Sequence, residues 1–64
     1  MYKIEIWQFH GITETFENED VREVVRWFNE NWKWSYENVG CSFIVYKDNQ
    51  ELSFNEEYEL GFHD

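Results

Sequence analysis

The stretch that decides the fold lies at the start of the chain, where residues 2–18 read YKIEIWQFHGITETFEN. Apolar and polar residues alternate on both sides of Gly11, and a period of two is typical of a half-buried strand. Gly11 can supply the left-handed residue of a three-residue loop, Phe9 to Gly11. This loop pairs Ile4 with Phe16, Ile6 with Glu14, and Gln8 with Ile12. We therefore predict a hairpin, one face of which collects Ile4, Ile6, Ile12 and Phe16.

A two-residue turn at His10 and Gly11 is the alternative for this hairpin. It would place Ile4 opposite Glu17, because a slip of one residue exchanges the two faces of a strand. That arrangement sets an apolar residue against a charge, so the three-residue loop is preferred.

The next segment, residues 18–33, has the period of an amphipathic helix. Asn18 is the expected N-cap, since Glu19 and Asp20 would then lie in the first turn and oppose the positive end of the helix dipole. We expect the helix to end near Lys33. Its apolar stripe consists of Val21, Val25, Phe28 and Trp32, with Val24 and Trp27 beside it.

A second hairpin is predicted in the last third of the chain. Residues 41–46 have the β-branched and aromatic density of a strand, and Asp48-Asn49 is predicted to form a two-residue turn. The expected pairs are Val45 with Leu52 and Phe43 with Phe54. Two segments stay open: residues 34–40 form a connection in preference to an extra strand, and residues 55–64 either extend the strand or pack as an irregular tail.

These elements predict an α+β fold: a single ββαββ domain over residues 1–64. One mainly antiparallel sheet would carry one helix packed across one face.

Composition agrees with a folded domain of unusual charge. The chain has fourteen acidic residues, five basic residues and a net charge of −9, together with four Trp, four Tyr and six Phe. High charge with few aromatic residues would indicate disorder, but these side chains can bury enough apolar area to fold. A folded acidic surface repels phosphate backbones and attracts basic protein surfaces. Direct nucleic-acid binding is therefore disfavoured.

The sequence offers little for catalysis or for a cofactor. Glu56, Glu57 and Glu59 lie close to His63 in the sequence, but a domain this small has little interior from which to build a pocket that shifts pKa values. We expect no enzyme activity, no cofactor and no metal, with His10 and His63 solvated. Crowded carboxylates are also expected to raise one another's pKa, which would increase stability toward mildly acidic pH.

Cysteine content and hydropathy bear on the compartment. Cys41, the sole cysteine, cannot form an intrachain disulfide and is expected to be a small buried hydrophobic residue. The opening residues contain no long apolar run, so we expect neither a signal peptide nor a membrane span. The cytoplasm is the predicted location.

The distribution of acids suggests protein binding. After Lys47 the chain carries no basic residue but has Asp48, Glu51, Glu56, Glu57, Glu59 and Asp64. If Ile4, Ile6, Phe43 and Val45 face the helix, then Trp7, Ile44 and Tyr46 face away from it. Apolar anchors within a charged rim are typical of an interface. The predicted binding residues are Trp7, Tyr46, Glu51, Glu56, Glu57 and Glu59.

The predicted function is that of an acidic inhibitor or adaptor that docks a basic, nucleic-acid-binding surface of a partner protein and mimics a phosphate backbone. Such a protein would suit a phage or a mobile element that neutralises a bacterial nuclease or immune complex. The alternative is an assembly module that homodimerises through the outer face of its sheet. Three further possibilities remain: the acidic surface serves solubility alone, the C-terminal tail covers the outer face, or the aromatics bind bases or sugars.

Overall fold

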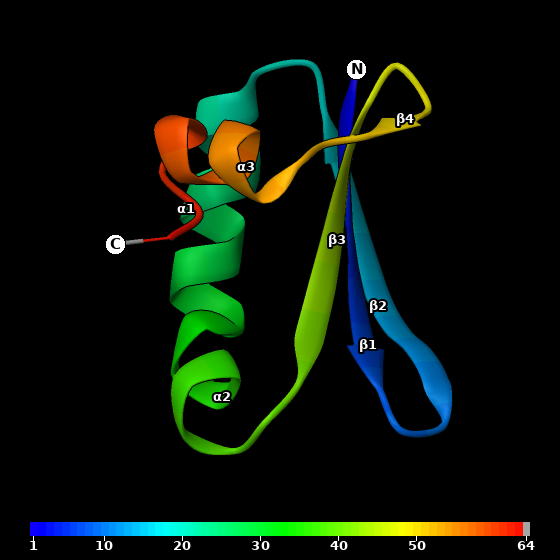
Figure 1. The fold of residues 1–64 in the computed structure, drawn as a ribbon, viewed down its shortest axis with the longest axis vertical. Coiled ribbons are helices and arrows are strands. Elements are labelled where there is room, and N and C mark those ends of the chain that lie inside the picture. The colour runs from blue at the N-terminus through cyan, green and yellow to red at the C-terminus, as the bar shows by residue number, and fades with distance from the viewer. Residues whose placement is uncertain (64) are drawn as a thin grey trace.

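A four-stranded antiparallel sheet forms one side of the molecule, and the helices lie against one of its faces in the computed structural model (Figure 1). The structure describes residues 1–63. The elements are β1 (Tyr2–Gln8), β2 (Gly11–Asn18), α1 (Val21–Asn31), α2 (Lys33–Asn38), β3 (Ser42–Lys47), β4 (Gln50–Glu51) and α3 (Phe54–Leu60). The strand order is β2-β1-β3-β4. The α+β class and the ββαββ order are confirmed, and α2 and α3 are additional to the predicted helix.

The first hairpin has the predicted register up to Ile6 and a different register from Trp7 to the turn. Ile4 pairs with Phe16 and Ile6 with Glu14, as predicted. Trp7, however, pairs with Ile12, and the extra residue between these pairs makes a β-bulge. The loop therefore has two residues, Phe9 and His10. The bulge moves Ile12 to the face of Trp7, where it is 50% exposed, so its predicted place on the inner face was wrong.

Helix α1 begins two residues later than predicted. Asp20 is the N-cap, and its Oδ1 accepts a hydrogen bond of 3.0 Å from the backbone N–H of Arg22. Asn18 remains in β2, and its Oδ1 accepts from the backbone N–H of Asp20 at 2.8 Å. The predicted cap was therefore wrong: the Asn18 side chain stabilises the turn that leads into the helix, and Asp20 caps the helix.

Residues 34–40 form neither of the structures considered from the sequence. The chain bends at Trp32, whose backbone N–H donates to the carbonyl of Phe28 at 2.8 Å, and then continues as α2. The indole of Trp32 donates to Glu14 on β2 at 2.7 Å. Helix α2 exposes 69% of Trp34, whereas the ring of Tyr36 packs on Phe43 of β3 with centroids 5.1 Å apart.

The second hairpin has the predicted turn, but its second strand is short. Asp48 and Asn49 have φ angles of 50° and 69°, which this turn requires. The backbone N–H of Leu52 donates to the carbonyl of Val45 at 2.8 Å, so the predicted pairing of these residues is confirmed. The chain then leaves the sheet, and Phe54 lies in α3 rather than opposite the third strand.

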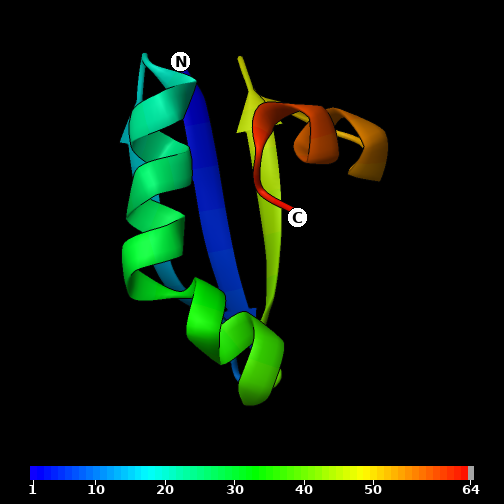
Figure 2. The same ribbon diagram turned by 90° about the vertical axis from the view of Figure 1, so that its left-hand side faces the viewer.

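Helix α3 replaces the strand or irregular tail expected for residues 55–64; residue 64 lies outside the described residues. Ser53 and Glu56 form a capping box, in which each side chain accepts from the other residue's backbone N–H, at 3.2 and 3.0 Å. Gly61, with φ 101°, ends the helix in the left-handed conformation. Figures 1 and 2 show α3 level with the first half of α1.

The core lies between the sheet and the helices. Its fully buried side chains are Ile4, Ile6, Val24, Phe28, Val45 and Phe62. Phe28 packs on Phe43 with ring centroids 4.5 Å apart, which joins α1 to β3. Val24, which was expected beside the stripe, is at its centre. Cys41 is buried as predicted, and burial raises the pKa of its thiol. Among the described residues, no helix has the length and apolar character needed to cross a bilayer.

Candidate binding face

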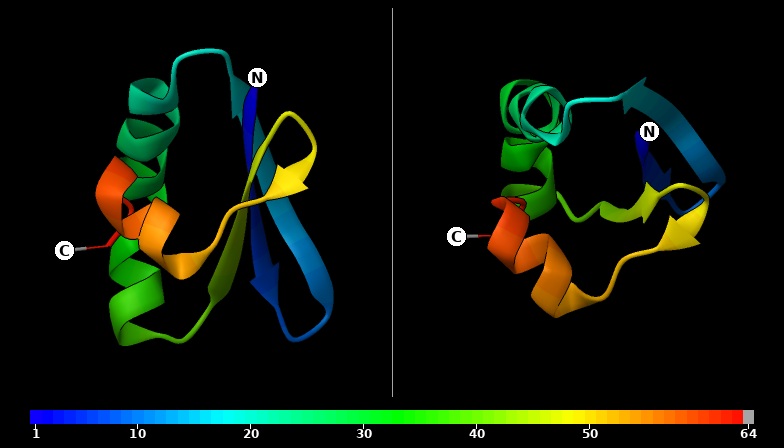
Figure 3. Two further views of the ribbon diagram at one scale, coloured as in Figure 1. Left: turned by 45° about the horizontal axis from the view of Figure 1, so that its top comes forward. Right: turned by 90° about the horizontal axis from the view of Figure 1, so that it is seen from above.

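The face of the sheet that points away from the helices is the candidate site, and we call it the outer face. The helices of residues 1–63 all lie on the opposite side of the sheet (Figure 3). Alternation along the strands and the observed pairing assign the outer face the side chains of Lys3, Glu5, Trp7, Ile12, Thr15, Glu17, Ile44, Tyr46 and Glu51. Trp7, Ile44 and Tyr46 therefore lie together as predicted.

A buried carboxylate holds the centre of this face. Glu5 is 8% exposed although no helix covers it. Its Oε1 accepts from the Tyr46 hydroxyl at 3.0 Å and from the Trp7 indole N–H at 3.3 Å. Its Oε2 forms an ion pair with Lys3 Nζ at 3.3 Å. The Lys3 ammonium also lies 5.1 Å from the centre of the Tyr46 ring. One carboxylate thus joins two aromatic side chains and a cation from neighbouring strands.

The electrostatics of this cluster keep Glu5 ionised. Burial by itself would raise the pKa of the Glu5 carboxyl, but hydrogen bonds from Tyr46, Trp7 and Lys3, together with the charge of Lys3, outweigh it and hold the pKa below its ordinary value. The hydrogen bond to Glu5 raises the pKa of the Tyr46 hydroxyl, and burial and the negative charges of Glu5 and Glu51 act in the same direction.

The carboxylate therefore fixes the orientation of the two aromatic rings. A half-buried Trp or Tyr would otherwise sample several rotamers and lose that freedom on binding a partner. Trp7 and Tyr46 share one acceptor, and these hydrogen bonds restrain both rings within the isolated chain. The sequence places the two aromatics on this face with Glu5 beside them as an exposed charge of the rim. In the structure Glu5 is instead buried and holds both rings.

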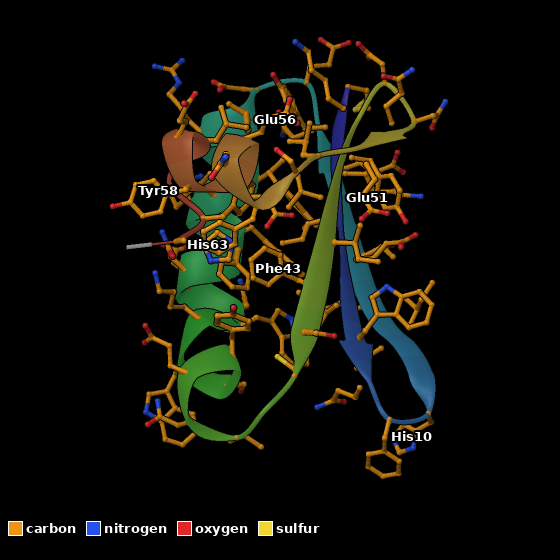
Figure 4. All side chains as sticks on the ribbon, in the orientation of Figure 1. His10, Phe43, Glu51, Glu56, Tyr58 and His63 are labelled. Atoms are coloured by element: carbon orange, nitrogen blue, oxygen red, sulfur yellow. The ribbon has the colours of Figure 1, made fainter. Side chains whose placement is uncertain are left out.

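The six predicted binding residues do not share one surface. Trp7, Tyr46 and Glu51 lie on the outer face, where Tyr46 and Glu51 are cross-strand partners. Glu56 and Glu59 lie on α3, on the helix side of the sheet, as the positions of Glu51 and Glu56 in Figure 4 show. There they line a pocket of about 180 Å³ together with Tyr2, Lys47, Leu52 and Leu60.

Glu57 does not lie on the surface. It is 8% exposed, and its Oε1 is 2.9 Å from Nε2 of His63. The His63 ring packs against Phe54 and Phe43, with ring centroids 4.5 and 5.3 Å apart. The prediction that His63 is solvated was wrong, because the turn at Gly61 brings the chain back under α3 (Figure 4). Glu57 is thus a structural residue of the C-terminal segment and not part of the outer face.

Three acids of the run after Lys47, Asp48, Glu56 and Glu57, have partners within the protein. Asp48 pairs with the N-terminal ammonium at 2.9 Å, and Glu56 belongs to the capping box. Hydrogen bonding to the N-terminus lowers the pKa of Asp48, and hydrogen bonding to Ser53 lowers that of Glu56. The expectation that crowding raises carboxyl pKa values is therefore wrong for these two groups, as it is for Glu5. Asp64 lies outside the described residues.

The hairpin tip carries His10, which is exposed and contacts Phe9 with ring centroids 4.1 Å apart. Within residues 1–63, no three His, Cys, Asp or Glu side chains gather in a way that could hold a metal ion.

Comparison with known proteins yields no relative of this chain: no protein-family model, no curated protein and no solved structure matches it. The function of this protein is therefore inferred from the geometry of its outer face.

Proposed function

We propose that this protein is a non-enzymatic binding module whose outer face docks a basic surface of a partner protein. The observation that supports this proposal is the ordered pair of aromatic side chains, Trp7 and Tyr46, held by the buried carboxylate of Glu5 on a sheet face without a helix layer. Preordered aromatics near the centre of a surface are the residues that contribute most to protein interfaces. Ile44 lies between them and extends the apolar centre.

The charge around this centre argues for a basic partner. Glu17 and Glu51 are exposed on the outer face, on β2 and β4 at its two sides. The cation of the face, Lys3, is paired with Glu5. A partner with basic residues around an apolar pocket would match this arrangement, and charge attraction would speed its association. In this proposal the carboxylates of the rim take the positions of phosphates in a nucleic-acid-binding site of the partner.

The proposal narrows the set of binding residues to Trp7, Tyr46, Glu51 and Glu17. We also propose that the protein has no enzyme activity and that it is located in the cytoplasm. A single buried cysteine, Cys41, is compatible with that reducing compartment. Origin in a phage or mobile element remains part of the same proposal.

A second candidate is a homodimer through the outer face. The half-exposed Ile12 favours it, because this residue adds apolar area beside Trp7. The net charge of −9 on each copy opposes it.

Affinity capture from bacterial lysate at low and high salt tests the proposal when it is combined with matched variants. A specific partner should be retained by the parent, lost with Trp7→Ala, and retained with Trp34→Ala, which changes an exposed Trp on α2. Glu51→Lys should slow association mainly at low salt. A partner whose capture is indifferent to Trp7→Ala would overturn the proposal. A dimer in sedimentation that Trp7→Ala converts to a monomer would establish the second candidate instead.

A further inference from the structure

The free edge of the sheet at β2 is a second surface that the fold leaves open. In residues 1–63, β2 has a strand neighbour on one side, β1, while its other side borders no strand. Residues 12–15 of this strand are all exposed. An edge strand of this length presents a row of backbone donors and acceptors that can pair with another extended chain.

The hydrogen-bond pattern of the sheet shows which residues present these groups. The Val45 carbonyl accepts from Leu52, so the polar backbone groups of Val45 point toward β4 and away from its β1 partner Ile4. In an antiparallel ladder, the N–H and C=O of one residue point to the same side and successive residues alternate. The N–H and C=O of Ile4 therefore point toward Phe16 on β2.

The same alternation extends to the outer side of β2. Because Phe16 directs its N–H and C=O at β1, its neighbours Thr15 and Glu17 direct theirs away from the sheet. Their side chains belong to the outer face, since they pair with Glu5 and Lys3. The edge and the outer face thus form one continuous surface.

The charge of the edge indicates what can pair with it. Strand β2 contains Glu14 and Glu17 and no basic residue, and Glu19 follows it. A cross-strand neighbour of opposite charge stabilises a strand pair, whereas a like charge destabilises it. A second copy of this chain would set two such acidic strands side by side, each on a molecule of net charge −9. A strand rich in lysine or arginine meets no such repulsion.

We propose that the β2 edge binds an extended, basic segment of a partner protein as an added strand, with the backbone of Thr15 and Glu17 providing the hydrogen bonds. This inference rests on the proposed binding function and specifies the partner chemistry that its surface accepts. The partner's basic side chains that lie on the outer face would be adjacent to Glu17, and the added strand would enlarge the sheet next to the Trp7 and Tyr46 anchors.

A defined probe tests the edge without knowledge of the natural partner. The probe is a short synthetic peptide of alternating Thr and Lys, and the readout is its dissociation constant together with amide exchange along β2. Thr15→Pro removes an outward N–H that the sheet does not use, and proline is tolerated at such edge positions. Thr15→Val keeps that N–H and controls for the side chain. Thr15→Pro should weaken binding about tenfold, the loss expected for about one hydrogen bond, and Thr15→Val should leave it nearly unchanged.

The outcomes separate strand addition from general charge attraction. Equal binding of the peptide to the parent and to Thr15→Pro would overturn the inference. If Thr15→Pro does not fold, amide hydrogen exchange in the parent protein is the deciding measurement. The exchange rates of the Thr15 and Glu17 amides must fall when the peptide is bound, and unchanged rates would overturn the inference. Capture of a natural partner that depends on Trp7 but not on Thr15→Pro would leave outer-face docking intact and contradict strand addition.

Discussion

The two faces of the sheet use the same strands but are ordered by different interactions. On the inner face, Ile4 and Ile6 of β1 are fully buried under Phe28 and other apolar side chains of the helix layer. On the outer face, Glu5 is nearly as buried, yet its surroundings are Lys3, Trp7 and Tyr46 from the sheet itself. The first face excludes water by packing against another layer, and the second orders its side chains by hydrogen bonds. A sheet face can therefore be ordered and still remain available to a partner.

The largest expected effect comes from the inner face. Phe28→Ala removes the fully buried ring that contacts Phe43, Tyr36 and Phe62, and it should cost about 3 to 5 kcal/mol, comparable with the whole stability of a domain this small. The variant should lose its cooperative thermal transition. Phe9→Ala deletes the same ring at a position that is 96% exposed and should melt with the parent. Cooperative melting of Phe28→Ala within a few degrees of the parent would contradict this assignment of the core.

The next largest effect on stability is expected in the C-terminal segment, where His63 packs against Phe43 on the inner face. Glu57 and His63 form a pair whose side chains are each 11% exposed, so the loss of either partner leaves a poorly solvated polar group. A double-mutant cycle with Glu57→Gln and His63→Ala should give a coupling free energy of about 0.5 to 3 kcal/mol. Chemical denaturation of the four proteins measures it. Additive effects of the two substitutions would show that the pair does not hold α3 in place; Glu59→Gln, at an exposed site, is the control.

The hairpins were predictable because their signals are local. Alternation over β1 and β2 defined which side chains share a face, and Asp48-Asn49 is a turn sequence whose residues tolerate positive φ. The bulge near Ile12 was not predictable, since the loop residues are compatible with either a three-residue loop or a two-residue loop followed by a bulge. Its consequence is confined to one end of the hairpin.

Helix α3 was missed for a different reason. Tyr58, Leu60 and Phe62 alternate in the sequence, and this strand-like period was given more weight than the Ser53–Glu56 capping box and Gly61. In the structure the three residues do not share a face: Phe62 is fully buried, Leu60 is half-buried and Tyr58 is exposed. The local capping signals were the more reliable ones, because they describe how a helix begins and ends.

For the site, the sequence alone was enough to predict which face of the sheet carries the two aromatic side chains. Alternation placed Trp7 and Tyr46 on the outer face, and the structure agrees. The role of Glu5 was not predictable, because it depends on Tyr46, which lies 41 positions further along the chain, reaching the same oxygen as Trp7. The burial of Glu57 likewise follows from the turn at Gly61 and not from the spacing of the acids.

A smaller effect is expected when the outer-face cluster loses one donor. Tyr46→Phe removes the hydroxyl that donates to Glu5 at 3.0 Å and keeps the ring. It should lower the free energy of unfolding by about 0.5 to 1.5 kcal/mol, the range for one hydrogen bond. Tyr58→Phe removes a hydroxyl from a side chain that is 53% exposed on α3 and should have no measurable effect. If urea denaturation gave the same free energy of unfolding for both variants, the cluster would not order the outer face.

The smallest expected effect is a pH dependence that belongs to Glu5. Because the pKa of this carboxyl is lower in the folded protein than its ordinary value of 4.5, ionised Glu5 stabilises the fold. That contribution is fully present above pH 4.5 and is lost as the pH falls through the lower pKa of the folded state. Glu5→Gln cannot ionise, so the stability gap between it and the parent should be constant from neutral pH down to about pH 5 and should shrink below that.

Urea midpoints measured for both proteins at a series of pH values from 7 to 3 would test this expectation. Phe9→Ala is the control, because its small difference in stability from the parent should not change with pH. A gap that widens on acidification would mean that burial dominates over the hydrogen bonds from Tyr46 and Trp7. The outer face would then be a strained site that a partner relieves, and the proposed ordering of its two aromatics by Glu5 would be wrong.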